Sequence, residues 1–383
     1  MSEVVSATGE TSNGAGDGTL AAHAGERAAV LGEPVRPGPV LSTIYHLNGV
    51  PGTGASDGYG RADNPTYRDL EAAIGALEGG SVHTRVFATG MAAISAVLFG
   101  LLKAGDTVVV PSDGYYATRP LSADRLAAFG VTVREAPTVG PYPLDGAALV
   151  LLETPSNPGM DVCDLVAVAA QAHAAGALVA VDNTTATPLG QRPLDLGADL
   201  VLASDTKALT GHGDLLLGHV STRDQALAAR IAQWRTWTGS VPGPFEAWLA
   251  HRSLATLDLR LARQATNALA VAELLSKRPE VTGVRYPGLA TDPAYPVAVA
   301  QMRRFGGVLS ATLPGREFVD RMLAASALAG AVTSFGDVRT SIDRRAQWGG
   351  DVVPEGFVRI SCGIEDTADL LADFTAALDT AAG

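Results

Sequence analysis

The chain has 383 residues, of which 47% are hydrophobic and 18% are charged, and its formal net charge is −12. This composition predicts one large domain with a smaller one and argues against wholesale disorder. No basic block occurs and the apolar runs are short, so nucleic acids and membranes are not expected as partners.

The cysteines and histidines show no pattern of a metal site. Cys163 and Cys362 lie far apart in dissimilar contexts, and the seven histidines show no ligand spacing, so no metal is expected. The first residues have neither the basic region nor the apolar core of a secretory signal. Together with the small number of cysteines, they favour a cytoplasmic protein.

The first 64 residues are expected to lie outside the main domain. Residues 1–18 are small, polar and acidic, which predicts a disordered tail. Residues 19–64 are rich in Gly and Pro and lack periodicity, which predicts an extended arm that packs on a neighbouring subunit. A helix should follow, because Asn64 can cap it and Pro65 suits its first turn.

Residues 65–244 are predicted to form an α/β domain with a mainly parallel central sheet. Short continuous apolar runs alternate with helical runs such as GMAAISAVLFGLL, as expected when both faces of a sheet are covered. The candidate strands are TRVFAT, DTVVVPS, VTVREA, ALVLLET, ALVAVDN, ADLVLAS and LGHVST.

Residues 245–383 are predicted to form a smaller α+β domain. It begins with one long linking helix over residues 245–276. Its candidate strands are VTGVRYP, GGVLSATL and GFVRISCG.

Lys207 lies in an unusual place for a lysine. The chain has only two others, Lys103 and Lys277, and each closes an apolar helical run, where a cation suits the helix dipole. Lys207 instead follows an apolar strand, lies among hydroxyl groups and precedes a Gly-rich loop. A chemical role is therefore expected for its amine.

Polar groups follow neighbouring strands at the edge where Lys207 lies. Because ligands of open α/β sheets bind beyond the carboxyl ends of the strands, these groups are expected to converge. Each alone has an ordinary explanation, such as a turn or a cap, but the combination is far more specific. The groups are Gly90, Met91, Tyr115, Asn157, Asp182, Ser204 and Thr206.

One cofactor, pyridoxal 5′-phosphate (PLP), needs this set of groups. Its aldehyde requires a lysine amine, and its pyridine nitrogen requires a carboxylate that keeps the nitrogen protonated. A helix N-terminus and hydroxyl groups suit its phosphate, and an aromatic side chain suits its ring. The sequence therefore predicts PLP as the cofactor.

Five motifs of the chain together resemble those of one known family. They are YGRADNPTYRDLEAAIGALEGG, ATGMAAI, ETPSNPGMDVCDL, VDNTTATPLGQRPLDLGADLVLASDTKALTGHGDLLLG and VRISCGIED. The family that they resemble is the Cys/Met-metabolism family of PLP-dependent enzymes, which includes cystathionine γ-synthase, cystathionine γ-lyase and methionine γ-lyase. The resemblance runs from about Tyr59 to the last helix. It implies the PLP-dependent transferase fold of type I, similar to aspartate aminotransferase, small amino-acid substrates, and a homotetramer built as a dimer of dimers.

The resemblance implies a role for each cofactor-binding residue. Lys207 would hold the cofactor aldehyde as a Schiff base and later transfer protons, and Asp182 would pair with the pyridine nitrogen. Tyr115 would stack on the ring and assist proton transfer, and Asn157 would hydrogen-bond the phenolic oxygen. The phosphate would be held by the amides of Gly90 and Met91 and the hydroxyls of Ser204 and Thr206.

The resemblance also implies residues at the substrate and at a subunit interface. Arg359 would bind the substrate α-carboxylate, a bidentate contact that suits arginine, with Ser334 and Asn157 beside it. Tyr59 and Arg61 would reach the phosphate of the neighbouring subunit, so each active site would be built from two chains.

The reaction implied by the resemblance is a γ-elimination at a carbon–sulfur bond. Cystathionine γ-lyase activity, which converts L-cystathionine and water to L-cysteine, 2-oxobutyrate and ammonia, is favoured. The alternatives are γ-replacement, as in cystathionine γ-synthase or O-acylhomoserine sulfhydrylase, and a specialised C–S lyase of secondary metabolism.

Departures from the family pattern lie near the distal end of the substrate and leave its identity open. Tyr115 is followed by Tyr116, Ala117 and Thr118. Methionine γ-lyases have a cysteine just after this tyrosine, and many members of the family have Gly-Gly at the first two of these three positions. Thr333 stands where many members have an acidic residue. The segment GDVRTSIDRRAQWGGDVVPEG lacks the Met-Thr-His run that is often found there in the family.

Two other classes of protein fit less well. A nicotinamide dehydrogenase could be argued from GTGASDG, but its glycines (Gly52, Gly54 and Gly58) follow no predicted strand, open no helix and have the wrong spacing. A non-catalytic binding protein on this fold would lack Lys207 or Asp182, and both are present.

Overall fold

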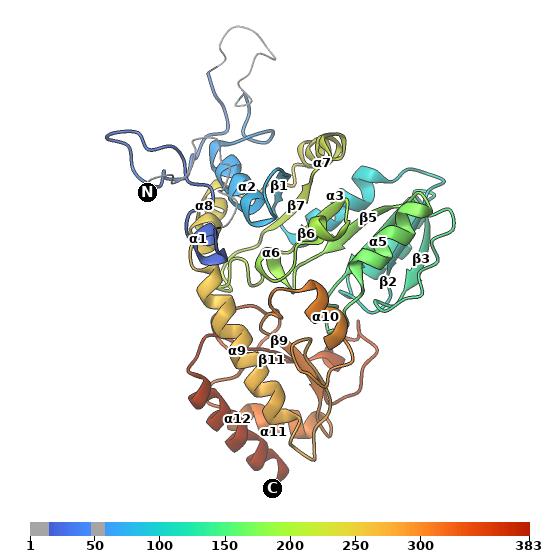
Figure 1. The fold of residues 1–383 in the computed structure, drawn as a ribbon, viewed down its shortest axis with the longest axis vertical. Coiled ribbons are helices and arrows are strands. Elements are labelled where there is room, and N and C mark those ends of the chain that lie inside the picture. Colours follow the sequence, from blue (N-terminus) through green and yellow to red (C-terminus); the bar gives the residue numbers. More distant parts are fainter. Residues whose placement is uncertain (1–14, 47–57) are drawn as a thin grey trace.

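A seven-stranded sheet forms the centre of the larger part of the molecule (Figure 1). In the computed structural model, which describes residues 15–46 and 58–383, its strand order is β1-β7-β6-β5-β4-β2-β3. Within this sheet, six of the strands run in one direction and β7 alone runs in the opposite direction, so the predicted mainly parallel sheet is confirmed. The strands are β1 (His83–Phe87), β2 (Thr107–Pro111), β3 (Thr132–Ala136), β4 (Leu149–Glu153), β5 (Leu178–Asp182), β6 (Leu200–Ala203) and β7 (Gly218–Thr222).

Helices cover both faces of this sheet. Val108 and Val110 of β2 pack toward α3 and α7, whereas Val109 between them packs toward α5. This alternation explains why the strands read as unbroken apolar runs. The helices of this part are α1 (Asp17–Ala22), α2 (Pro65–Leu77), α3 (Gly90–Leu101), α4 (Thr118–Pro120), α5 (Leu165–Ala174), α6 (Thr187–Gly190) and α7 (Gln225–Thr238).

Side-chain caps fix where the helices around the sheet begin. Asn64 accepts a hydrogen bond from the Thr66 amide at 2.8 Å at the start of α2. Thr89 caps α3 by accepting from the Ala92 amide at 3.0 Å. Because an N-terminal cap satisfies amides that the helix itself cannot, these side chains set the first residue of each helix.

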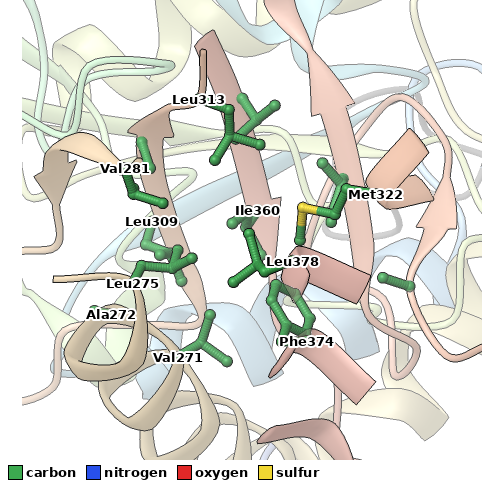
Figure 2. Packing of buried hydrophobic residues seen from close by; sticks show 14 of the residues in the cluster. Val271, Ala272, Leu275, Val281, Leu309, Leu313, Met322, Ile360, Phe374 and Leu378 are labelled. Atoms are coloured by element: carbon green, nitrogen blue, oxygen red, sulfur yellow. The ribbon is translucent and has the colours of Figure 1, made fainter. Parts of the chain in front are cut away.

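The smaller unit is a five-stranded sheet backed by helices, in the order β10-β11-β12-β9-β8. Figure 2 shows its core, where Val271 and Leu275 of α9 meet Ile360 of β12 and Phe374 and Leu378 of α12. Its elements are β8 (Thr282–Arg285), β9 (Val308–Thr312), β10 (Gly330–Ala331), β11 (Ser341–Arg344), β12 (Phe357–Ser361), α9 (Leu257–Leu275), α10 (Tyr295–Gln301), α11 (Arg316–Ala325) and α12 (Thr367–Ala382). Helix α8 (Pro244–Leu254), which precedes α9 in the chain, packs instead against α2 of the larger part.

The helix predicted over residues 245–276 is interrupted, and α8 ends before α9 begins. The interruption frees the carbonyl of Ser253, which accepts from the Arg260 guanidinium at 2.9 Å and from the Thr256 amide at 3.3 Å. Arg260 also donates to the carbonyls of Ala208 and Leu209 at 2.7 and 3.1 Å. A side chain one turn into α9 therefore replaces the helical hydrogen bonds that the break removes.

The N-terminal part differs in detail from its prediction. Helix α1 begins at Asp17, inside the predicted tail, and the arm beyond it has no regular helix over residues 23–46. Most of the tail, and the glycines Gly52 and Gly54, lie outside the described residues. The division near residue 244 stays a prediction. Among the described residues, no helix is both long and apolar enough to cross a bilayer.

Candidate active site

A cavity of about 1050 Å³ lies at the carboxyl ends of β4, β5 and β6, between the two units. Both units contribute to its wall, since Lys207 follows β6 and Arg359 belongs to β12. The predicted residues that line it are Gly90, Met91, Tyr115, Asn157, Asp182, Ser204, Thr206, Lys207, Ser334 and Arg359.

Lys207 is carried by a tight turn directly after β6. Its amide donates to the Ser204 carbonyl at 3.1 Å, and its carbonyl accepts from the Gly211 amide at 2.9 Å. The ammonium lies 5.5 Å from the centre of the Phe335 ring. The pKa of Lys207 is lowered to about 8, first by burial and then by the charge of Arg359, while the charge of Asp182 opposes the shift.

Asp182 ends β5 beside this turn and is 8% exposed. Its Oδ1 accepts hydrogen bonds from the amide and the hydroxyl of Thr184. Burial raises the pKa of Asp182, while these hydrogen bonds and the charge of Lys207 oppose the rise. A buried carboxylate of this kind is stabilised by a cationic partner in the cavity.

Glu153 is a site residue that the sequence reasoning missed. It ends β4, pairs in register with Asp182 and is 6% exposed. Its two oxygens accept from two backbone amides, Tyr115 at 2.6 Å and Asn157 at 2.8 Å. Burial raises the pKa of Glu153 well above its usual range, and the neighbouring Asp182 adds to the rise. The signal was an acid at the end of a wholly apolar strand, LVLLE.

The start of α3 and the turn after β6 form a close-fitting cradle. A Cβ at Gly90 would lie 2.5 Å from the Cβ of Ser204, so only glycine fits there. The first-turn amides of a helix favour an anion such as phosphate. The Thr206 hydroxyl donates to the Leu217 carbonyl at 3.2 Å, so it would have to change partner to donate to a phosphate.

Arg359 is buried and held on several sides. It donates to Asn157 Oδ1 and the Ser334 carbonyl, both at 2.7 Å, and to Asp343 Oδ2 at 3.0 Å. Its Nε has no partner among the described residues. Burial and the charge of Arg345 lower the pKa of Arg359 to about 10, and Asp343 opposes the shift. An unpartnered buried N–H is a donor for a ligand oxygen.

Two adjacent tyrosines form an aromatic wall. The rings of Tyr115 and Tyr116 lie 5.1 Å apart at 62°, and the Arg345 guanidinium lies 5.9 Å from the Tyr116 ring. Burial raises the pKa of Tyr115, and the neighbouring Tyr116 adds to the rise. The Tyr115 hydroxyl therefore keeps its proton at neutral pH.

A triad with no exposed surface anchors the Lys207 turn from behind. His219 of β7 bonds Asp205 Oδ1 at 2.7 Å through Nδ1 and Glu78 Oε1 at 3.3 Å through Nε2. Burial lowers the pKa of His219, but the two carboxylates outweigh it and raise the pKa to about 10. His219 therefore carries a positive charge at neutral pH and ties α2 to the residue two places before Lys207.

Tyr59 and Arg61 do not line the cavity of their own chain. Tyr59 is 46% exposed, and the Arg61 guanidinium lies 5.5 Å from its ring and donates to the Thr236 carbonyl at 2.6 Å. Their role in a partner's site stays a prediction.

The residues present fit PLP. The cavity offers a lysine with a lowered pKa, a buried carboxylate near it, a helix N-terminus that only glycine allows to approach, and an aromatic wall. The unpartnered Nε of Arg359 adds a donor for a substrate oxygen.

Comparisons with known proteins agree with this geometry. A profile of the family described as "Cys/Met metabolism PLP-dependent enzyme" matches residues 18–379. A Streptomyces coelicolor protein named "Putative cystathionine gamma-lyase" is 57% identical over 95% of this chain and 94% of its own. Cystathionine gamma-synthase of Mycobacterium tuberculosis is 38% identical over 95% of this chain and 97% of its own.

A solved structure matches over almost the full chain. Cystathionine gamma synthase from Xanthomonas oryzae pv. oryzae, in complex with cystathionine, superimposes with a TM-score of 0.90 at 35% identity, covering 97% of this chain and 99% of that chain. The fold is therefore the α/β fold of type I, as the sequence predicted. The chain belongs to the Cys/Met metabolism family of PLP-dependent enzymes, which act on carbon–sulfur bonds.

Proposed function

We propose that this enzyme binds PLP and cleaves L-cystathionine to L-cysteine, 2-oxobutyrate and ammonia by γ-elimination. The observation that carries the proposal is the convergence of Lys207, Asp182 and Arg359 on one cavity. The 57% identity to the protein named "Putative cystathionine gamma-lyase" supports this substrate over the others.

The proposed cofactor contacts follow from the geometry of the cavity. Lys207 binds the aldehyde, Asp182 faces the ring nitrogen, Tyr115 covers the ring, and Asn157 lies beside the phenolic oxygen. The phosphate lies at the start of α3, against Ser204 and Thr206. When bound, PLP supplies an electron sink for the negative charge that develops at the substrate α-carbon.

The protein's own groups then position the substrate and move its protons. Arg359 holds the α-carboxylate, with Ser334 beside it, and this contact places the Cα–H bond near Lys207. With a pKa of about 8, a useful fraction of the Lys207 amine is neutral at neutral pH and can take the α-proton. Tyr115 keeps its proton and can donate it to the leaving sulfur.

A γ-replacement is the second candidate. The relatives named cystathionine gamma-synthase share 38% and 35% identity with the chain over nearly its whole length. In that reaction a thiol, rather than water, completes the sequence. The two reactions use the same Lys207, Asp182 and Arg359, so their products must separate them.

The experiment measures products from purified holoenzyme. With L-cystathionine, we expect 2-oxobutyrate and a free thiol in equal amounts, and Lys207→Ala should reduce the rate by about 10²–10⁴-fold. Parallel reactions contain L-methionine, or an O-acylhomoserine with cysteine. No 2-oxobutyrate from cystathionine, with cystathionine formed from the acylhomoserine reaction, would show a synthase instead.

A further inference from the structure

Asp343 lies directly opposite Arg359 in the small sheet. The two residues are paired in register on the antiparallel strands β11 and β12, so their side chains share one face. Asp343 is 2% exposed and accepts four hydrogen bonds from side chains. The donors are Arg359 Nη2 (3.0 Å), Arg345 Nη1 (2.7 Å), Gln347 Nε2 (3.2 Å) and Trp348 Nε1 (2.8 Å).

These contacts determine which donors of Arg359 stay available. Asp343 and the Ser334 carbonyl engage Nη2, Asn157 engages one hydrogen of Nη1, and Nε is left without a partner among the described residues. A guanidinium held by acceptors in its own plane cannot rotate freely. Asp343 therefore fixes the direction in which the unused N–H groups point.

Arg345 connects this carboxylate to the aromatic wall of the cavity. Its Nε and Nη2 donate to Asp351 Oδ2 at 2.9 and 2.7 Å, while its guanidinium lies over the Tyr116 ring. Arg119 lies 3.9 Å from Asp351 and donates to the Gly350 carbonyl. The turn over residues 345–351 is thus tied to Arg359 on one side and to Tyr116 on the other.

The charges of this cluster leave a place for one anion. The cluster holds three guanidinium groups and two carboxylates, and its buried members are almost without solvent to screen them. The excess of one positive charge is neutralised when a carboxylate binds. The guanidinium groups belong to Arg119, Arg345 and Arg359, and the carboxylates to Asp343 and Asp351.

We propose that Asp343 is the positioning residue for Arg359, and that it sets the affinity of this site for the α-carboxylate of an amino acid. The proposal rests on the function assigned above to Arg359. Asp343 acts through the guanidinium and not on the substrate itself. Without its charge, Arg359 and Arg345 repel each other across the gap that Asp343 occupied.

The test is the variant Asp343→Asn in the full-length holoenzyme. The ligand is 2-methylalanine, which has an α-carboxylate but no α-proton, and its dissociation constant is measured from the absorbance change of the bound cofactor. We expect the constant, and the KM for the reacting substrate, to rise about tenfold or more, with kcat changed by less than about twofold. The amide of 2-methylalanine should bind both proteins equally.

Glu355→Gln is the matched control. Glu355 pairs with Arg344 at 2.7 Å, next to Asp343 in sequence, but its side chain is 71% exposed. This variant should keep the wild-type constants. Unchanged or tighter binding in Asp343→Asn would overturn the proposal. Tighter binding would mean that Asp343 merely competes with the ligand carboxylate for Arg359 in the wild type.

Two further variants keep the result interpretable. If Asp343→Asn does not fold, Arg345→Gln, which removes one buried partner of Asp343, should raise the dissociation constant about threefold or more. An unchanged constant contradicts the proposal. Arg359→Ala should abolish carboxylate-dependent binding. If Arg359→Ala still binds the ligand through its carboxylate, the function assigned to Arg359 is wrong. If Arg359→Ala loses binding but the Asp343 and Arg345 variants bind normally, only the positioning role of Asp343 is wrong.

Discussion

Lys207 owes its lowered pKa to burial first and to the charge of Arg359 second. Both favour the neutral amine, which is the nucleophilic form. Arg359 thus has two proposed effects, because it attracts the substrate carboxylate and also helps to deprotonate the lysine.

We predict that the attachment of PLP to the cofactor-free protein follows a pKa of about 8. The rate should rise with pH to a plateau above that value, since only the neutral amine reacts. Arg359→Gln should move the midpoint to higher pH, because it removes a neighbouring positive charge. Absorbance of the attached cofactor gives the rate, and a wild-type midpoint near the ordinary lysine value of 10.5 would contradict the prediction.

Glu153→Gln is expected to destabilise the fold. Both carboxylate oxygens accept from backbone amides, whereas the amide nitrogen of glutamine cannot accept, so one buried N–H would lose its partner. The free energy of unfolding should fall by about 1–3 kcal/mol in urea denaturation. The exposed Glu355→Gln change should cost less than about 0.5 kcal/mol, and an equal loss in both variants would rule out this explanation.

The sequence could suggest residues with a recognisable motif but not those that act through them. Lys207 and Asp182 lie at the ends of apolar strands, and they supply the amine and the carboxylate that PLP requires and few other cofactors do. Asp343, by contrast, lies in TSIDRR, a short polar strand with no apolar run to mark it. Its meaning appears only when β11 pairs with β12 and places it opposite Arg359.

At the scale of elements, the Glu78–His219–Asp205 triad joins α2, β7 and the Lys207 turn. Because the folded state raises the pKa of His219 to about 10 from 6.5, it binds a proton that the unfolded chain releases near pH 6.5. The raised pKa of Glu78 acts in the same direction. The contribution of His219 to stability is complete below pH 6.5 and is lost as the pH rises toward 10.

We predict that His219→Gln lowers the free energy of unfolding by about 3–5 kcal/mol at pH 7, since it leaves buried carboxylates without a cation. The difference from the wild type should shrink between pH 7 and pH 10. Urea denaturation of the cofactor-free proteins at several pH values measures it. A difference that is independent of pH would mean that His219 is not charged in the folded protein.

Element boundaries were predictable where caps and apolar runs mark them, as at Asn64 and along β2 to β7. The break between α8 and α9 was not, because its sequence, SLATLD, contains neither Gly nor Pro. Arg260 makes this break possible by donating to the freed carbonyl of Ser253. This contact forms only in the folded chain, so the sequence alone does not reveal it.

At the scale of the molecule, the arm suggests that this chain does not act alone. Leu31 and Val35 are almost fully exposed, and Leu41 and Ile44 are largely so. Because such exposed apolar side chains are typical of interaction surfaces, we predict that another chain covers this segment. The predicted dimer of dimers, with Tyr59 and Arg61 reaching across, would cover it.

Mixing two inactive variants tests this sharing of sites. Lys207→Ala and Arg61→Ala each damage every site of their own oligomer, but a hybrid dimer has one site with both wild-type residues if Arg61 acts across the interface. After unfolding and refolding together, we expect about a quarter of the wild-type activity, since half of the dimers are hybrids with one intact site each. No recovery would place Arg61 in the site of its own chain.

The break between α8 and α9 also has a mechanical consequence. Arg260 donates both to the Ser253 carbonyl at the end of α8 and to the carbonyls of Ala208 and Leu209, which immediately follow Lys207. Helix α9 runs from this point along the smaller unit (Figure 1). A rotation of the smaller unit about this contact would therefore be transmitted through Arg260 and would displace the turn that carries the Lys207 amine.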